Sequence, residues 1–316
     1  MHIQIRHLCK TYKTVKAVND LSFDIKSGEI FAILGPNGAG KSSTLRMLVG
    51  LTTVDKGEIL INKGEQQITR LSSEQFGYLP EERGLYQETS IHKTLHYIAA
   101  LKGMKKSDAE QQIQFWLEEF DLLDRQKEPL KALSKGNQQK IQLLSSIIHR
   151  PELVILDEPF SGLDPVNQEK VIQFLTTLKE QGTTILLSAH QMSLVEKLAD
   201  RLLLMAKGKA VLYGDMKQIR AASTLGSTLS LELAECPAEE VLTTAQQQLS
   251  DVLAITPVDQ FNIQLRLSGG CHIPTLLKQV MAMLPVANLQ LQQPGLHEIY
   301  LHALSDSNAE KEHQDD

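Results

Sequence analysis

Long apolar runs and cysteines are scarce in this sequence of 316 residues. No apolar stretch approaches the ~20 residues that a membrane-spanning helix requires, and the opening residues alternate like a strand instead of forming the apolar core of a signal peptide. The 3 cysteines are scattered without metal-ligand spacing, which predicts reduced, structural thiols. With 38 acidic and 32 basic residues, the net charge of -6 argues against a nucleic-acid backbone as the main partner. We therefore expect a cytoplasmic protein.

The composition is that of a globular protein, and the length suits one large and one smaller domain. In the first 218 residues, the segment 1–34 alternates as short strands, and helical spacing dominates from about residue 90 to 150. Strands return at 153–156 and 184–187, with an amphipathic helix between them. That order is a βαβ crossover, which predicts parallel, buried strands.

The remaining residues, 219–304, are predicted to form a small α+β domain. It begins with a linker-like segment at 223–227 and contains several strands and two helices, at 238–249 and 274–284. The last dozen residues, 305–316, are polar and acidic, which predicts a disordered tail.

The stretch from Gly35 to Ser42 has the complete G-x-x-x-x-G-K-[ST] spacing of a phosphate-binding loop. An apolar strand at 30–34 leads in and a helix at 43–49 leads out, which aims backbone N–H groups and a helix dipole at a polyphosphate. A glycine-rich turn without a ligand is the alternative. We expect Lys41 to reach the β- and γ-phosphates and the Ser42 hydroxyl to ligate Mg²⁺. The expected nucleotide contacts are Gly35, Pro36, Asn37, Gly38, Ala39, Gly40, Lys41, Ser42 and Ser43.

Two adjacent carboxylates, Asp157 and Glu158, follow the apolar strand 153–156. The carboxyl ends of strands in an α/β sheet form the edge where ligands bind. Adjacent acids there can be solubilising charge alone. In a chain with a phosphate loop we instead expect Asp157 to hold Mg²⁺ through its hydration shell and Glu158 to orient and deprotonate the attacking water.

The segment from Leu133 to Gln138 opens a further helix at 141–148. Ser134 is a good N-cap residue, which is its simplest explanation. Together with Gly136 it also makes a second helix start that is able to bind an anion.

In their order along residues 1–218, these motifs resemble those of the nucleotide-binding subunit of an ATP-binding cassette (ABC) transporter. The signature-like segment Leu133–Gln138, the residues from Ser161 to Asp164, and the residues from Ser188 to His190 complete the match. The resemblance implies an α/β fold of the P-loop NTPase class. It has a mixed β core, an antiparallel β subdomain and a helical arm at about 90–150, with the small α+β domain following it.

The resemblance also implies roles for residues that the chemistry alone leaves open. Tyr12, which could equally be a packing residue, would stack on the adenine ring, and His190, otherwise a structural histidine, would contact the γ-phosphate and the catalytic region. Ser134, Gly136 and Gln138 would act in trans and close over the ATP held by a second copy. Two complete sites then need two cassettes, most simply in a twofold homodimer.

Two motifs depart from the family pattern. Glu81 stands where the family usually has glutamine, and we expect it to approach Mg²⁺ and the attacking water with one more negative charge. The signature has Lys135 and Asn137 where other residues are commoner, but it keeps the phosphate-facing Ser134 and Gly136. The string from Pro80 to Tyr86 is similar to that of a bacterial exporter branch that includes the sodium-efflux ATPases, in which a small C-terminal domain follows the cassette.

The function implied by the resemblance is an ATP-hydrolysing motor subunit that drives a separate transmembrane permease, most simply an exporter. The surface between Glu81 and about residue 130 would receive the permease; a solvated helical face is the alternative reading of that segment. The chain would be cytoplasmic, peripheral on the inner face of the cell membrane, and would contact the membrane through the permease only.

A soluble ABC ATPase acting on ribosomes or DNA is the second hypothesis. It is less favoured because such members usually carry two cassettes in one chain with a charged linker, whereas this chain has one cassette and a negative net charge. A non-enzymatic ATP-binding regulator is disfavoured because Glu158 is present.

Overall fold

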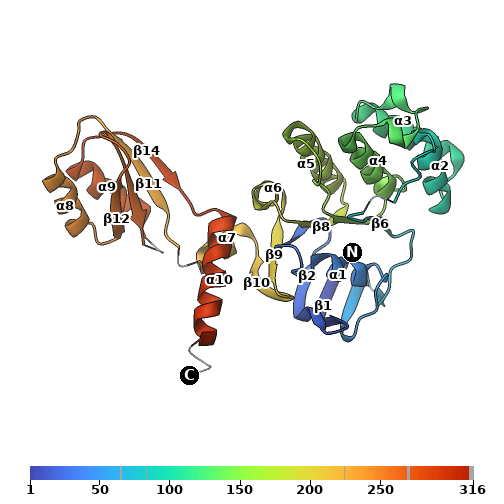
Figure 1. Cartoon of the computed structure of the whole chain (residues 1–316), viewed down its shortest axis with the longest axis horizontal. Coiled ribbons are helices and arrows are strands. Elements are labelled where there is room, and N and C mark those ends of the chain that lie inside the picture. Colours follow the sequence, from blue (N-terminus) through green and yellow to red (C-terminus); the bar gives the residue numbers. More distant parts are fainter. Residues whose placement is uncertain (65, 83, 224, 269–270, 313–316) are drawn as a thin grey trace. The chain divides into compact units, whose positions relative to one another are not determined.

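The computed structural model divides the chain into two compact units, Met1–Tyr213 and Gly214–Asp316 (Figure 1). The division falls at the end of a strand hairpin and not after residue 218. In the described part of the chain, no helix combines the length and the apolar character that a membrane crossing needs. The structure describes residues 1–64, 66–82, 84–223, 225–268 and 271–312.

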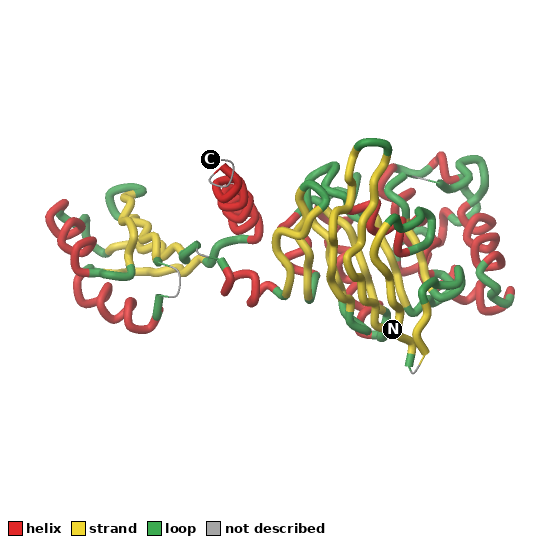
Figure 2. Tube along the Cα trace, turned by 90° about the horizontal axis from the view of Figure 1, so that it is seen from below, coloured by secondary structure: helices red, strands yellow, loops and turns green. Residues whose placement is uncertain are grey.

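The first unit contains two sheets, and Figure 2 shows its strands gathered together with the helices set around them. The smaller sheet corresponds to the expected antiparallel subdomain, because β1 pairs antiparallel with both β2 and β4, and β4 pairs antiparallel with β5. Its strands are, in spatial order, β2 (Val15–Ile25), β1 (His2–Tyr12), β4 (Lys56–Lys63) and β5 (Gln66–Ile68).

The larger sheet carries the phosphate-loop strand and the strand that ends in the two carboxylates. Every residue of β3, β7 and β8 is buried, and β3–β8, β7–β8 and β6–β7 pair in parallel, which confirms the prediction of parallel, buried strands. The spatial order is β10 (Lys209–Gly214), β9 (Arg201–Ala206), β3 (Ile30–Leu34), β8 (Thr184–Ala189), β7 (Leu153–Asp157) and β6 (Phe76–Leu79).

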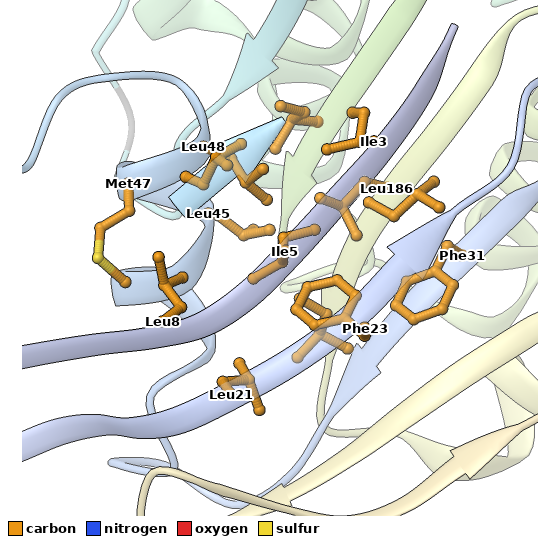
Figure 3. Packing of buried hydrophobic residues seen from close by; sticks show 14 of the residues in the cluster. Ile3, Ile5, Leu8, Leu21, Phe23, Phe31, Leu45, Met47, Leu48 and Leu186 are labelled. Carbon is orange, nitrogen blue, oxygen red and sulfur yellow. The ribbon is translucent and has the colours of Figure 1, made fainter. Parts of the chain in front are cut away.

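A hydrophobic core fills the space between these two sheets (Figure 3). Ile5 of β1 and Leu186 of β8 meet there with Leu45 of helix α1 (Lys41–Leu48), and all three are at most 2% exposed. The rings of Phe23 and Phe31 stack with centroids 5.3 Å apart and planes within 9°. Burial of each such side chain stabilises the fold by about 1.5–3 kcal/mol, so the helix that follows the phosphate loop is firmly anchored.

Helices replace strands between β6 and β7, as the helical spacing predicts. The main ones are α2 (Ile91–Leu101), α3 (Lys106–Glu119) and α4 (Lys135–Ile147), which lie side by side in Figure 1. Short 3-10 helices, Leu123–Arg125 and Leu130–Ala132, connect α3 to α4. Trp116 of α3 packs edge-on against Phe174 of α5 (Pro165–Glu180), with centroids 5.0 Å apart, and so joins the arm to the crossover helix. The helix α6 (Met192–Leu198) follows β8.

The second unit forms a four-stranded antiparallel sheet with both crossover helices packed on the same hydrophobic face. The element order strand–helix–strand–strand–helix–strand includes a fourth strand, β14, that the sequence pattern did not predict. The elements are α7 (Met216–Ala222), β11 (Thr228–Leu233), α8 (Glu239–Gln248), β12 (Val252–Pro257), β13 (Asn262–Leu267), α9 (Ile273–Met283) and β14 (Val286–Gln292).

The expectation of a disordered tail at 305–316 is wrong for its first part. Helix α10 (Leu296–Glu312) continues through residues 305–312. This stretch contains neither proline nor glycine, and it follows a helix start anchored by buried Leu296 and Ile299, so the helix propagates into the polar segment. Residues 313–316, and Thr224 of the expected linker, lie outside the described residues.

Candidate functional site

The phosphate loop joins buried β3 to α1, as the spacing predicts. Gly40 occupies the N-cap of α1 with φ 103, a left-handed conformation that favours glycine. A Cβ at Gly40 would lie 2.2 Å from the carbonyl oxygen of Ala17, and a Cβ at Gly35 would lie 2.4 Å from that of Met205. The backbone around the loop therefore leaves no room for a side chain at either glycine.

The loop surrounds a cavity of about 320 Å³ with a row of backbone donors. Among the described residues, the N–H groups of Gly38, Gly40 and Lys41 donate to no backbone carbonyl. An anion is the natural acceptor for such groups at a helix start. The residues that line the cavity are Val15, Ala17, Asn37, Gly38, Ala39, Gly40, Lys41, Ser42, Ser43, Glu81 and Glu158.

The Lys41 ammonium group is turned back onto the loop. Its Nζ donates to the carbonyl oxygens of Gly35 at 2.9 Å and of Pro36 at 3.4 Å, and it lies 3.4 Å from Oε1 of Glu158. Lys41 is 6% exposed and the Glu158 side chain 10%. The two buried charges therefore neutralise one another within the cavity.

Asp157, at the end of β7, has one occupied and one unoccupied carboxylate oxygen. Oδ1 accepts hydrogen bonds from Oγ of Ser42 at 3.0 Å and from Oγ of Ser188 at 2.5 Å. Oδ2 is buried and has no hydrogen-bond partner among the described residues. Because Mg²⁺ prefers oxygen ligands, the free Oδ2 and the neighbouring Ser42 hydroxyl fit a magnesium site.

Glu158 has a strained backbone conformation, which hydrogen bonds to Ser188 hold in place. Its φ of 54 is left-handed, which is uncommon for a residue with a side chain. Its N–H donates to both the carbonyl oxygen of Ser188, at 3.2 Å, and the Oγ of Ser188, at 3.1 Å. Its Oε2 lies 2.8 Å from Nδ1 of the half-exposed His190. The structure thus brings Lys41, Glu158 and His190 together, although they are distant in sequence.

Glu81 lines the same cavity, and a residue of the signature helix supports its segment. Nε2 of Gln142 donates to the carbonyl oxygens of Pro80 and Glu82, both at 3.3 Å. Gln142 is 4% exposed. The sequence analysis did not predict these two hydrogen bonds. In the sequence, their one sign is a glutamine among the apolar residues of this helix. Nearby, burial and the charge of Asp157 raise the pKa of Tyr78 above its ordinary value.

Tyr12 lies at the end of β1, directly opposite Val15 in the antiparallel register. Its side chain is 41% exposed, and the ammonium group of Lys10 lies 5.5 Å from the ring centroid. Val15 belongs to the cavity lining, but Tyr12 is absent from the described residues that line it. The structure therefore brings the backbone partner of Tyr12 to the phosphate cavity and leaves the expected stacking on adenine a prediction.

The signature-like segment starts helix α4, and Ser134 is its N-cap as predicted, with Oγ accepting from the N–H of Asn137 at 3.3 Å. Nε2 of Gln138 donates to the carbonyl oxygens of Leu130 and Leu133 at 3.2 and 3.1 Å. Ser134, Gly136 and Gln138 are absent from the described residues that line the phosphate cavity. A single chain thus does not bring its signature-like segment to its own phosphate loop.

Comparisons with known proteins agree with this geometry. The family model described as "ABC transporter" matches residues 18–161. The uncharacterized ABC transporter ATP-binding protein YhaQ of Bacillus subtilis is 46% identical over 69% of this chain and 72% of that protein. The linearmycin resistance ATP-binding protein LnrL of Bacillus subtilis is 29% identical over 95% of this chain and 97% of that protein, so its similarity extends through the second unit.

A solved structure shows the same fold in three dimensions. The dimeric structure of a post-hydrolysis state of the ATP-binding cassette MJ0796, bound to ADP and Pi, is 21% identical. The similarity covers 68% of this chain and 98% of the MJ0796 chain, with a TM-score of 0.61. From the phosphate loop, the strand carboxylates and these relatives together, we conclude that the chain belongs to the ABC transporter ATP-binding proteins, a family of ATP hydrolases with the P-loop NTPase fold.

Proposed function

We propose that this chain is the motor subunit of an ABC exporter, in which two copies close around two ATP molecules and drive a separate membrane permease. The observation that carries the proposal is the separation of the signature-like segment from the phosphate cavity of the same chain. Lys41, Ser42 and Glu158 line the phosphate cavity and Asp157 accepts a hydrogen bond from Ser42, whereas the signature-like segment is absent from the described lining. The signature-like segment that completes the site then has to come from another cassette.

In this proposal each cavity residue has a distinct task. Ser42 and Asp157 would hold Mg²⁺, which would supply charge neutralisation for the triphosphate. The γ-phosphate draws Lys41 away from Glu158, since its charge is larger than that of one carboxylate. Glu158 then accepts a hydrogen bond from the attacking water and takes its proton. His190 orients the Glu158 carboxylate through the contact at 2.8 Å.

The proposed partner for the nucleotide site is a second copy of the chain. Ser134, Gly136 and Gln138 would then close over the γ-phosphate bound to the opposing loop, with the start of α4 as an anion-binding helix N-terminus. Tyr12 would stack on the adenine ring. The neighbour MJ0796, whose structure is described as dimeric with ADP and Pi, supports the pairing of two cassettes.

The proposed contact with the permease is the exposed apolar surface beside the helical arm. Tyr86 is 65% exposed and Tyr97 52%, and their rings pack edge to face with centroids 6.3 Å apart. Leu101, at the end of the same helix as Tyr97, is 64% exposed. Such a patch suits an apolar partner segment. The export direction draws on LnrL, which is named for resistance to linearmycin.

Fractionation of cells that carry the full-length chain tests the proposal. We expect the chain in the membrane fraction, peripheral on its inner face, and we expect Tyr86→Ala to shift it to the soluble fraction. Phe261→Ala, which changes an aromatic side chain that is 45% exposed in the other unit, is the matched control and should leave the distribution unchanged. Recovery of the chain wholly with ribosomes or DNA would contradict the proposal.

A further inference from the structure

The helical arm carries a cluster of three metal-binding side chains that the nucleotide site does not use. His92 and His96 are four residues apart on α2, which places both rings on one face of the helix. Glu110 reaches them from α3. Nε2 of His92 lies 3.1 Å from each Glu110 oxygen, and Nε2 of His96 lies 2.5 Å from Oε2.

The spacing of these atoms suits one small cation. One ligand atom of each residue lies within 4.8 Å of the other two. Around a tetrahedral zinc ion with bonds of 2.0–2.2 Å, the ligand atoms are about 3.3 Å apart. Small rotations of the three side chains would therefore bring them into coordination geometry.

The chemical types of the ligands favour a late transition metal over Mg²⁺ or Ca²⁺. Two imidazoles and one carboxylate are a typical three-residue zinc ligand set, with a fourth position left for water. The two rings are 20% and 30% exposed and Glu110 is 50% exposed, so an ion would reach the site from solvent while the imidazoles stay partly shielded.

The cluster also differs from the other histidine contacts in the described chain. His7 with Asp20, and His190 with Glu158, are pairs of one imidazole and one carboxylate. Among the residues that the structure describes, the arm cluster is the one group of three such side chains within this distance. Here two imidazoles, with ring centroids 4.6 Å apart, share one carboxylate.

We propose that His92, His96 and Glu110 bind one zinc-type divalent transition-metal ion, which ties α2 to α3. The ion would crosslink two helices that otherwise meet through side-chain packing and the turn between them. Because it binds the folded arm and not the unfolded chain, it would raise the thermal stability of the protein.

Calorimetric titration with zinc tests the proposal. The full-length chain is first stripped of metal with a chelator and is then kept in Mg²⁺ buffer. We expect one zinc per chain. His96→Ala and the shape-conserving Glu110→Gln should each weaken binding at least tenfold, because even the loss of a supporting contact to a metal ligand costs about 10–100-fold. The matched control, His7→Ala, removes an exposed histidine with a single carboxylate partner and should bind zinc like the parent chain.

Two further readouts separate this site from other zinc ligands. Zinc should raise the Tm of the parent chain and of His7→Ala, but not of Glu110→Gln. Cobalt bound in place of zinc should give visible d–d bands without a thiolate charge-transfer band, since no cysteine takes part. Equal zinc affinity in the parent chain and Glu110→Gln, a thiolate band, or no binding at micromolar zinc would overturn the proposal.

Discussion

Nζ of Lys41 and Oε1 of Glu158 lie 3.4 Å apart, and both side chains are buried in the wall of the phosphate cavity. Each charge is thus satisfied by the other, together with two loop carbonyls on the lysine side. A bound γ-phosphate would compete for Lys41 and release the carboxylate toward water. Nucleotide binding and activation of Glu158 are therefore coupled in our account.

Glu158→Gln is expected to abolish hydrolysis while ATP still binds. The amide keeps the shape of the carboxylate but cannot take a proton, and loss of a general base lowers the rate by about 10²–10⁴-fold. Phosphate release and equilibrium ATP binding measure the two effects separately. Glu152→Gln is the matched control, because Glu152 lies just before the same strand and its exposed carboxylate pairs with Lys63. Hydrolysis at the parental rate in Glu158→Gln would remove this residue from the base role.

Ser188→Ala and Ser42→Ala are expected to separate stability from magnesium binding. Both hydroxyls donate to Oδ1 of Asp157, but Ser188 is fully buried, whereas Ser42 lines the cavity. Loss of the buried donor should lower the free energy of unfolding by about 1–3 kcal/mol. Loss of Ser42 should instead weaken Mg²⁺-dependent nucleotide binding. Urea denaturation and nucleotide titrations with and without Mg²⁺ measure these effects; identical behaviour of the two variants would count against the assignment.

Gln142→Leu is expected to loosen the segment around Glu81. The change keeps the volume but removes both hydrogen bonds to the Pro80 and Glu82 carbonyls. We expect ATP binding at the loop to persist and turnover to fall, with about 1–3 kcal/mol less stability. Leu143→Met, a nearly isosteric change at the adjacent buried position, is the control for packing. Parental turnover in Gln142→Leu would show that the link has no part in the cycle.

His149 is expected to make the chain less stable in mild acid. Burial, helped by the charge of Lys102, lowers its pKa from 6.5 to about 4, and Nδ1 is buried without a partner among the described residues. Between these pH values the unfolded chain therefore binds a proton at His149, while the folded chain does not. The contribution of the neutral, buried imidazole to the free energy of unfolding is complete above pH 6.5 and is lost as the pH falls toward 4.

The expected loss is about 2 kcal/mol, since partial exposure of the ring screens the full effect. Urea denaturation of the parent chain and of His149→Gln across this pH range measures it. The glutamine variant keeps a donor for the carbonyl of Phe76 but does not titrate, and it should show a shallower pH dependence. Equal slopes in the two proteins would contradict the prediction.

Local patterns in the sequence predicted the phosphate loop, the parallel strands and most helices, because each depends on neighbouring residues. The strand β14 was missed because its apolar–polar alternation, Leu289 and Leu291 between polar residues, is short and it lies at the edge of the sheet, paired with β11 alone. The tail prediction failed because composition alone does not reveal that a helix already nucleated at Leu296 continues into polar residues.

The motifs assigned Ser42 and Asp157 to one magnesium site, but individual contacts across the fold were not predicted. The direct hydrogen bond from Ser42 to Asp157 joins residues 115 positions apart, and no local pattern encodes it. The spacing of His92 and His96 is visible in the sequence, but the carboxylate that completes the cluster depends on how α3 packs against α2. The link from Gln142 to the Glu81 segment likewise exists only once α4 lies beside β6.

The central claim, that two chains complete each other's nucleotide sites, is tested most directly by sedimentation of Glu158→Gln with ATP and Mg²⁺. We predict that ATP converts the 35.2 kDa chain into a species of twice that mass. The double variant that adds Ser134→Arg should bind ATP at its intact loop and stay at the single-chain mass. A mass that ATP leaves unchanged in Glu158→Gln, or equal dimerisation of both variants, would contradict the account.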